Sequence, residues 1–198
     1  TQVEVDKDDP GFTHPTKPIG AFFSEAQRDE LQRAHPDWHF VEDSGRGYRR
    51  VVASPQPLRI VEADAIKTLT QKGFVVIGAG GGGIPVVRTE QGDYQSVDAV
   101  IDKDLAAALL AEQINADGLV ILTDADAVYE NWGTPQQRAI RHATPDELAP
   151  FAKADGSIGP KVTAVSGYVR SRSKPAWIGA LSRIEETLAG EAGTCISL

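Results

Sequence analysis

The chain has 198 residues, of which 41% are hydrophobic and 24% charged, with one cysteine and a formal net charge of −8 at pH 7. This length suits one sizeable domain or one domain with an appendage, and the acidic balance argues against a nucleic-acid-binding protein. A single cysteine excludes an intrachain disulfide, and no apolar run is long enough to span a membrane. We therefore expect a cytoplasmic protein that binds neither nucleic acid nor membrane.

The first third of the sequence predicts a strand followed by a small α+β appendage. Ser24 is a suitable N-cap, because its hydroxyl can accept a hydrogen bond from the first turn of a helix, and Pro36 ends that helix. The elements expected here are a strand at residues 1–5, a loop at 6–20, a helix at 25–34 and a hairpin with strands at 38–41 and 48–52.

The rest of the sequence alternates strands with helices, which is typical of a mainly parallel sheet with helices on both faces. A continuous apolar run at residues 74–77 predicts a strand buried on both faces, and Thr144 predicts the start of a helix. The other expected elements are helices at 62–71, 104–114, 161–171 and 175–188, extended chain at 84–87, and strands at 119–122 and 193–198. The predicted parts are a core strand at 1–7, the appendage at 8–57 and an α/β core at 58–198.

A glycine-rich loop, residues 78–83, follows the predicted strand at 74–77 and formally matches the dinucleotide-binding fingerprint G-x-G-x-x-G. That fingerprint needs a helix to open from the loop, whereas Pro85 and β-branched neighbours predict extended chain. The composition favours a loop whose backbone N–H groups approach an anionic ligand, and a merely flexible turn is the alternative.

Charged residues stand at the ends of several predicted elements. Lys103 lies between Asp102 and Asp104 at a helix start, and Lys161 lies in the first turn of another helix. Each position alone has an ordinary explanation as a solvated helix end, but lysine charges paired with carboxylates suit phosphoryl transfer. The four histidines show no metal-ligand spacing, so we predict no protein-held metal site.

Five motifs together resemble the carbamate kinases of the amino-acid-kinase fold family. They occur in the family's order and extend over essentially the whole chain: residues 15–20 (PTKPIG), 45–52 (GRGYRRVV), 80–85 (GGGGIP), 100–106 (VIDKDLA) and 156–162 (GSIGPKV). The resemblance implies a three-layer αβα sandwich with a mainly parallel sheet and a protruding lid at 8–57. It also implies reversible phosphoryl transfer from carbamoyl phosphate to ADP, giving ATP and carbamate, with Mg²⁺ carried on the nucleotide. The enzyme would be a homodimer and would act in arginine metabolism.

The same resemblance assigns roles to individual residues of this sequence. Lys17 would reach the transferred group from the lid, Lys103 and Lys161 would neutralise charge on the phosphoryl oxygens, and Asp104 would hold those two lysines. The phosphate or carbamate end would be cradled by Gly80, Gly81, Gly82 and Gly83. The nucleotide would lie by Thr123, Asp124, Val128, Tyr129, Trp132, Ile158 and Gly159.

Two glycine-rich loops that begin such enzymes do not occur in this sequence, so we expect it to be a C-terminal portion that lacks an N-terminal segment. Two alternatives stay open at this point. One is a related kinase that acts on an amino-acid carboxylate. The lid sequence at residues 15–20 favours carbamate over such a carboxylate as the substrate. The other is a non-catalytic fragment that binds nucleotide or dimerises.

Overall fold

The computed structural model describes residues 1–43, 45–153 and 157–198. Ser44 of the predicted hairpin and Gly156 of the fifth motif lie outside the described residues. The chain forms two units that interleave along the sequence: the first comprises Thr1–Glu62 and Ile77–Ala106, and the second comprises Ala63–Val76 and Ala107–Leu198. The predicted boundaries after residues 7 and 57 both fall within the first unit, and they stay predictions.

The first unit contains a four-stranded sheet with the order β5-β1-β6-β7. Strand β1 pairs antiparallel with β5 and parallel with β6, and its Val3 is fully buried together with Ile60 and Val86. These side chains form the apolar centre of the unit. The strands are β1 (Gln2–Val5), β5 (Pro57–Ile60), β6 (Ile84–Arg88) and β7 (Tyr94–Ser96).

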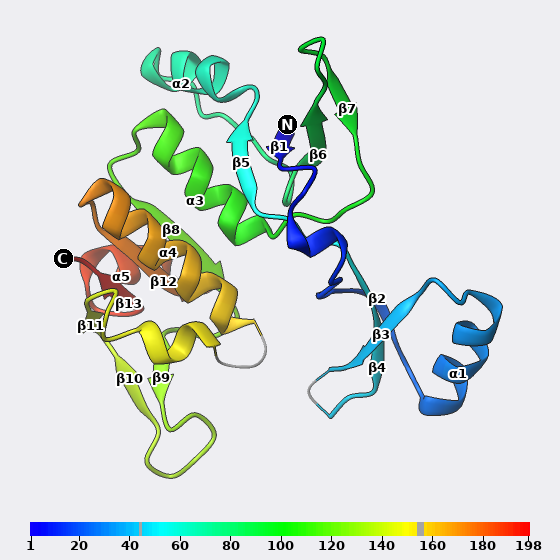
Figure 1. Cartoon of the computed structure of the whole chain (residues 1–198). Helices are drawn as coiled ribbons and strands as arrows, with labels where there is room; N and C mark the ends of the chain where they lie inside the picture. The colour runs from blue at the N-terminus through cyan, green and yellow to red at the C-terminus, as the bar shows by residue number, and fades with distance from the viewer. Residues whose placement is uncertain (44, 154–156) are drawn as a thin grey trace. The chain divides into compact units, whose positions relative to one another are not determined.

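The first unit also holds a three-stranded antiparallel sheet and a helix, at one end of the unit in Figure 1. The predicted helix is confirmed, because Ser24 Oγ accepts a hydrogen bond from Gln27 N while Ser24 N donates to Gln27 Oε1. The predicted hairpin is confirmed as well. These elements are β2 (Lys17–Phe23), α1 (Glu25–Ala34), β3 (His39–Glu42) and β4 (Tyr48–Val52), preceded by the 3₁₀ turn η1 (Pro10–Phe12).

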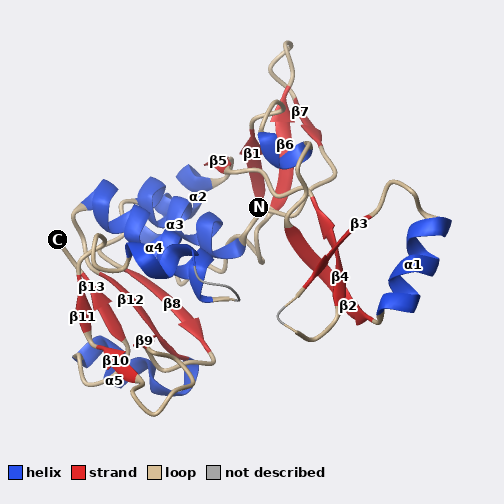
Figure 2. Cartoon of the chain, turned by 60° about the horizontal axis from the view of Figure 1, so that its bottom comes forward, coloured by secondary structure: helices blue, strands red, loops and turns tan. Residues whose placement is uncertain are grey.

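The second unit is built on a mixed sheet with the order β11-β13-β12-β8, whose strands lie side by side in Figure 2. Helix α4 contacts β8 and β12, and its Tyr168 is fully buried with Val165 and Val169. A β9-β10 hairpin adjoins the sheet through Thr194. The strands are β8 (Leu119–Thr123), β9 (Val128–Glu130), β10 (Arg138–Ile140), β11 (His142–Ala143), β12 (Ala176–Ala180) and β13 (Thr194–Ile196).

The helices of the second part of the chain mostly follow their predicted ranges. The predictions for residues 62–71, 104–114 and 161–171 are confirmed, and α3 begins in the first unit and continues into the second. None of the described helices is long and apolar enough to cross a membrane. The helices are α2 (Ala63–Gln71), α3 (Lys103–Ile114), α4 (Ile158–Arg172) and α5 (Ile184–Ala189), with 3₁₀ turns η2 (Ala149–Lys153) and η3 (Leu181–Arg183).

The prediction of a mainly parallel sheet is wrong for the described strands outside the appendage, because their four-stranded sheets are mixed and four of the seven pairings are antiparallel. The strand predicted at residues 74–77 is not formed. Within the described part of the chain no strand pairs with this segment, and Val75 and Ile77 are each 97% exposed. A strand buried on both faces needs such neighbours.

Two predicted helices are also wrong. The segment after Thr144 forms turns and the short η2, although Thr144 and Glu147 make the hydrogen bonds of a capping box. Residues 175–188 form β12, η3 and α5 in place of one long helix. Strand β12 pairs with β8 and β13, and Gly179 lies so close to the side chain of Thr187 that a Cβ at Gly179 would overlap it.

Candidate active site

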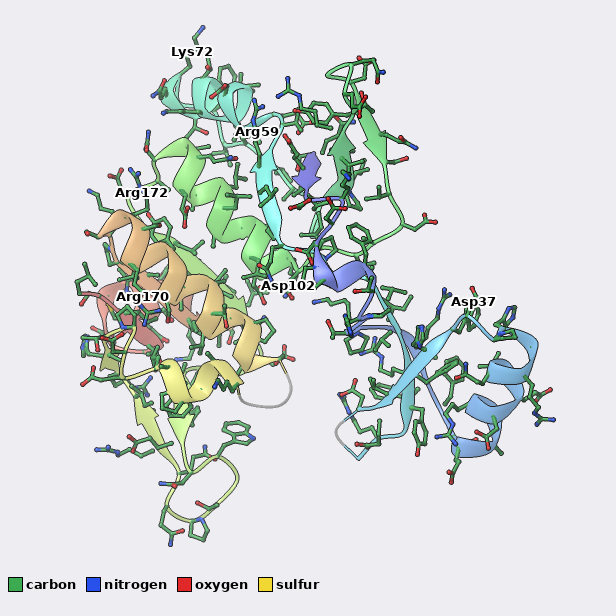
Figure 3. The ribbon with its side chains drawn as sticks, viewed as in Figure 1. Asp37, Arg59, Lys72, Asp102, Arg170 and Arg172 are labelled. Atoms are coloured by element: carbon green, nitrogen blue, oxygen red, sulfur yellow. The ribbon has the colours of Figure 1, made fainter. Side chains whose placement is uncertain are left out.

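In the first unit, Lys17 forms an ion pair with Asp102. Lys17 begins β2, and its Nζ lies 2.5 Å from Asp102 Oδ2. Asp102 directly precedes α3, and its Oδ1 accepts hydrogen bonds from Asp104 N at 2.8 Å and from Leu105 N at 3.2 Å. Figure 3 labels Asp102 at this helix start. The carboxylate therefore caps α3 with one oxygen and holds the predicted catalytic lysine with the other.

The environment of Asp102 favours its charged form. Burial alone raises the pKa of this carboxyl, but the hydrogen bond and the charge of Lys17, with the N–H groups of Leu105 and Asp104, outweigh it and lower the pKa below its usual value. Asp102 is therefore an anion over the physiological range. The sequence had indicated Asp102 only as a charge beside Lys103, and the signal for its real role was an Asp in the N-cap position of a predicted helix.

The other predicted catalytic residues lie on helices. Lys103 Nζ is 3.0 Å from Asp104 Oδ1, and the Lys103 side chain is 60% exposed while Asp104 is buried. This pairing agrees geometrically with the predicted support of Lys103 by Asp104. Lys161 belongs to α4 in the second unit and is only 4% exposed, which is rare for lysine. The support of Lys161 by Asp104 stays a prediction.

The glycine loop approaches the chain directly before α3. A Cβ at Gly82 would overlap the carbonyl oxygen of Ile101, and a Cβ at Gly83 would overlap the side chain of Val3. Gly80, Gly81 and Gly83 also have positive φ values, of 71°, 105° and 86°. The backbone of this loop therefore lies against the residue that precedes Asp102, in a conformation that glycine adopts without strain.

The second unit contains a cavity of about 460 Å³. Five of the seven residues predicted to lie by the nucleotide line it, namely Thr123, Val128, Tyr129, Trp132 and Ile158. Asp124 and Gly159, both described, are not among its lining residues. The other lining residues, to which sequence reasoning gave no role, are Ala125, Ala127, Asn131, Phe151 and Ser157. Of these, only Ser157 belongs to one of the five motifs.

One wall of the cavity is aromatic. The rings of Tyr129 and Trp132 have centroids 5.2 Å apart with an interplanar angle of 54°, and Trp132 is 67% exposed. Tyr129 Oη donates a hydrogen bond to Asp126, and this bond, with burial, raises the pKa of Tyr129. Asp126 also pairs with Arg183 at 3.4 Å and Arg141 at 3.8 Å. An aromatic and apolar wall of this kind suits a planar ring.

Residues 1–43, 45–153 and 157–198 contain no group of side chains suited to bind a metal ion. In those ranges no three His, Cys, Asp or Glu side chains are grouped so as to hold an ion. Cys195, the single cysteine, lies half-buried in β13, and burial raises the pKa of its thiol.

The chain is similar in sequence to curated carbamate kinases. The carbamate kinase of Escherichia coli strain K12 is 69% identical over 198 residues, which is 100% of this chain and 65% of that enzyme. The carbamate kinase of Haemophilus influenzae is 46% identical and is covered to 63% of its length. The chain therefore spans slightly less than two thirds of the length of these relatives.

Solved structures of carbamate kinases are also similar to this chain. The carbamate kinase from Giardia lamblia bound to citric acid superposes with a TM-score of 0.91 at 42% identity, over 100% of this chain and 63% of that one. The same kinase bound to AMP-PNP gives a TM-score of 0.82 over 99% of this chain and 63% of that one. The model of the amino acid kinase family matches residues 20–179. The chain therefore belongs to the amino acid kinase family.

Proposed function

We propose that this chain is the larger part of a carbamate kinase, which transfers a phosphoryl group from carbamoyl phosphate to ADP and forms ATP and carbamate. The observation that carries the proposal is the 69% identity to the Escherichia coli carbamate kinase from one end of the chain to the other. The solved relative with AMP-PNP supports a nucleotide as the second substrate. This identity favours carbamate over an amino-acid carboxylate as the acceptor.

The proposed chemistry uses charge and position. Phosphoryl transfer needs no strong protein nucleophile, so Lys17, Lys103 and Lys161 would neutralise charge on the phosphoryl oxygens. Asp102 supports this by fixing Lys17, and Asp104 by pairing with Lys103. Loss of one such lysine should cost about 2–4 kcal/mol of transition-state stabilisation, by analogy with a lost oxyanion donor.

The nucleotide would occupy the cavity of the second unit. The aromatic pair Tyr129–Trp132 would contact the nucleoside, and the backbone N–H groups of residues 80–83 would serve the phosphate or carbamate end. Mg²⁺ would arrive on the nucleotide phosphates, which is the usual way that this ion binds in kinases. The described residues offer no cluster of their own for it.

Several finer features belong to the same proposal. A three-layer αβα sandwich, a lid at residues 8–57 and a homodimer follow from the resemblance. So do a cytoplasmic location and a role in arginine metabolism. An N-terminal segment would complete the polypeptide, in keeping with the 65% share of the relatives' length.

The test is ATP formation from carbamoyl phosphate, ADP and Mg²⁺, measured on the 198-residue chain and on a chain extended by the part of the Escherichia coli enzyme that lies outside the match. We expect activity in the extended chain and its loss in Lys161→Ala of that chain. Full activity with Lys161→Ala would contradict the proposed mechanism. ADP binding without turnover in both chains would instead identify a nucleotide-binding protein.

A further inference from the structure

One buried hydroxyl of the second unit connects three strands. Thr194 in β13 is fully buried. Its Oγ1 accepts a hydrogen bond from Val128 N at 2.8 Å and donates one to the carbonyl oxygen of Ile140 at 2.6 Å. Val128 belongs to β9 and Ile140 to β10, and the two residues face each other in the register of that hairpin. The hydroxyl therefore ties the hairpin to the main sheet at this pair.

This connection lies directly beside the predicted nucleotide site. Val128 is 1% exposed and lines the cavity, and the next residue, Tyr129, forms half of the aromatic pair. Thr194 is not among the described lining residues of the cavity. A change at Thr194 can therefore reach a ligand only through the position of β9.

We propose that Thr194 is a positioning residue for nucleotide binding. Its hydroxyl holds β9 in the position in which Val128 and Tyr129 contact the nucleoside. The inference rests on the proposed function, because it takes the cavity to receive ADP or ATP. Without the hydroxyl, the buried N–H of Val128 and the partly buried carbonyl of Ile140 lose this hydrogen-bond partner. They can regain one only by moving toward each other or toward water, and either movement shifts β9 away from β13.

The chain offers a matched control for a buried threonine. Thr187 is also fully buried, and its Oγ1 donates a hydrogen bond to the carbonyl oxygen of Arg183 at 2.8 Å. It is not among the described residues that line the cavity. Thr187 takes no part in either hydrogen bond of Thr194, so Thr187→Val removes a buried hydroxyl from the same unit while the bonds to Val128 and Ile140 remain.

The experiment compares Thr194→Val, Thr194→Ser and Thr187→Val in the 198-residue chain. Two quantities are measured: ADP affinity by calorimetry, and the hydrogen-exchange rate of the Val128 amide without ligand. We expect Thr194→Val to weaken ADP binding by about fivefold to tenfold, the effect of one net hydrogen bond, and to speed exchange at Val128. Thr194→Ser should restore both values, and Thr187→Val should change neither.

The two readouts separate the failure of this inference from the failure of the proposed function. Wild-type protein that binds no ADP, either as the 198-residue chain or as the extended chain, would overturn the proposed function. Wild-type binding that Thr194→Val leaves unchanged, or an equal loss in Thr187→Val, would overturn the positioning role alone. If Thr194→Val does not fold, Thr194→Ala takes its place, because it removes the hydroxyl without adding a methyl group between the two polar atoms, and the same outcomes decide.

Discussion

The Nζ atom of Lys17 lies 2.5 Å from Asp102 Oδ2, although 85 positions separate the two residues along the chain. The pair joins the first residue of β2 to the residue that caps α3. The lysine that the resemblance assigns to the transferred phosphoryl group is thus held by a carboxylate with a second, structural task. The two tasks of Asp102 can be separated by substitution.

Asp102→Asn should keep the helix cap and remove the charge that holds Lys17. Asparagine caps a helix as well as aspartate does, so the free energy of unfolding should exceed that of Asp102→Ala by about 1 kcal/mol in urea denaturation. Both variants should lose at least about tenfold in ATP formation, measured in the extended chain, because Lys17 loses its counter-charge. Equal stability of the two variants would contradict the capping role, and unchanged turnover would contradict the catalytic one.

The ion pair also predicts how stability depends on acid. The folded pKa of Asp102 lies below its unfolded value of about 3.9, so the pair stabilises the fold fully above that pH. This contribution is lost as the pH falls through the folded pKa. Thermal unfolding between about pH 5 and pH 2 should show a shallower loss of stability in Asp102→Asn than in the wild type. Parallel curves for the two proteins would show that Asp102 does not contribute.

The glycine loop offers a test of close packing. Gly82→Ala should lower the free energy of unfolding by about 1–3 kcal/mol, because its Cβ would overlap the carbonyl oxygen of Ile101. Gly167→Ala is the matched control, since Gly167 lies inside α4 with open space around its position. Alanine there should raise the free energy of unfolding by about 0.5–1 kcal/mol. Urea denaturation of both variants measures the difference, and equal effects would contradict the close approach.

The aromatic wall predicts an effect on binding without one on stability. Trp132 is 67% exposed, so Trp132→Ala should change the free energy of unfolding by no more than about 0.5 kcal/mol. It should weaken ADP binding by about fivefold to tenfold through the loss of ring contact. Phe74→Ala removes another exposed aromatic, 60% exposed and outside the cavity, and should leave ADP binding unchanged. Equal ADP affinities of all three proteins would exclude Trp132 from the site.

Local signals in the sequence predicted the elements that local interactions stabilise. Helix α1 begins and ends where its capping box and the following proline place it. Strand β4 and its hairpin follow from a glycine-containing turn between two runs that contain aromatic residues and valine. Five residues chosen by resemblance line one cavity, because the end of β8, the segment from β9 to Trp132 and the first residue of α4 meet there.

The wrong predictions concern elements that depend on distant partners. Residues 175–188 have the apolar spacing of a helix, yet β12 gains two strand neighbours and a close contact between Gly179 and Thr187. No local signal in residues 175–188 shows that β8 and β13 are available as neighbours of β12. The role of Asp102 depends in the same way on Lys17, which is distant in sequence. Pairings of this kind, between residues that are distant in sequence, are decided by tertiary structure.

The exposed run at residues 74–77 has a consequence for how the 198-residue chain, taken by itself, behaves in concentrated solution. Phe74, Val75 and Ile77 are 60%, 97% and 97% exposed, and the run contains neither charge nor proline. Short, uncharged, β-branched segments of this kind are templates for intermolecular cross-β stacking. The chain should therefore self-associate increasingly as its concentration rises, and a charged gatekeeper such as Val75→Lys should suppress that in light scattering.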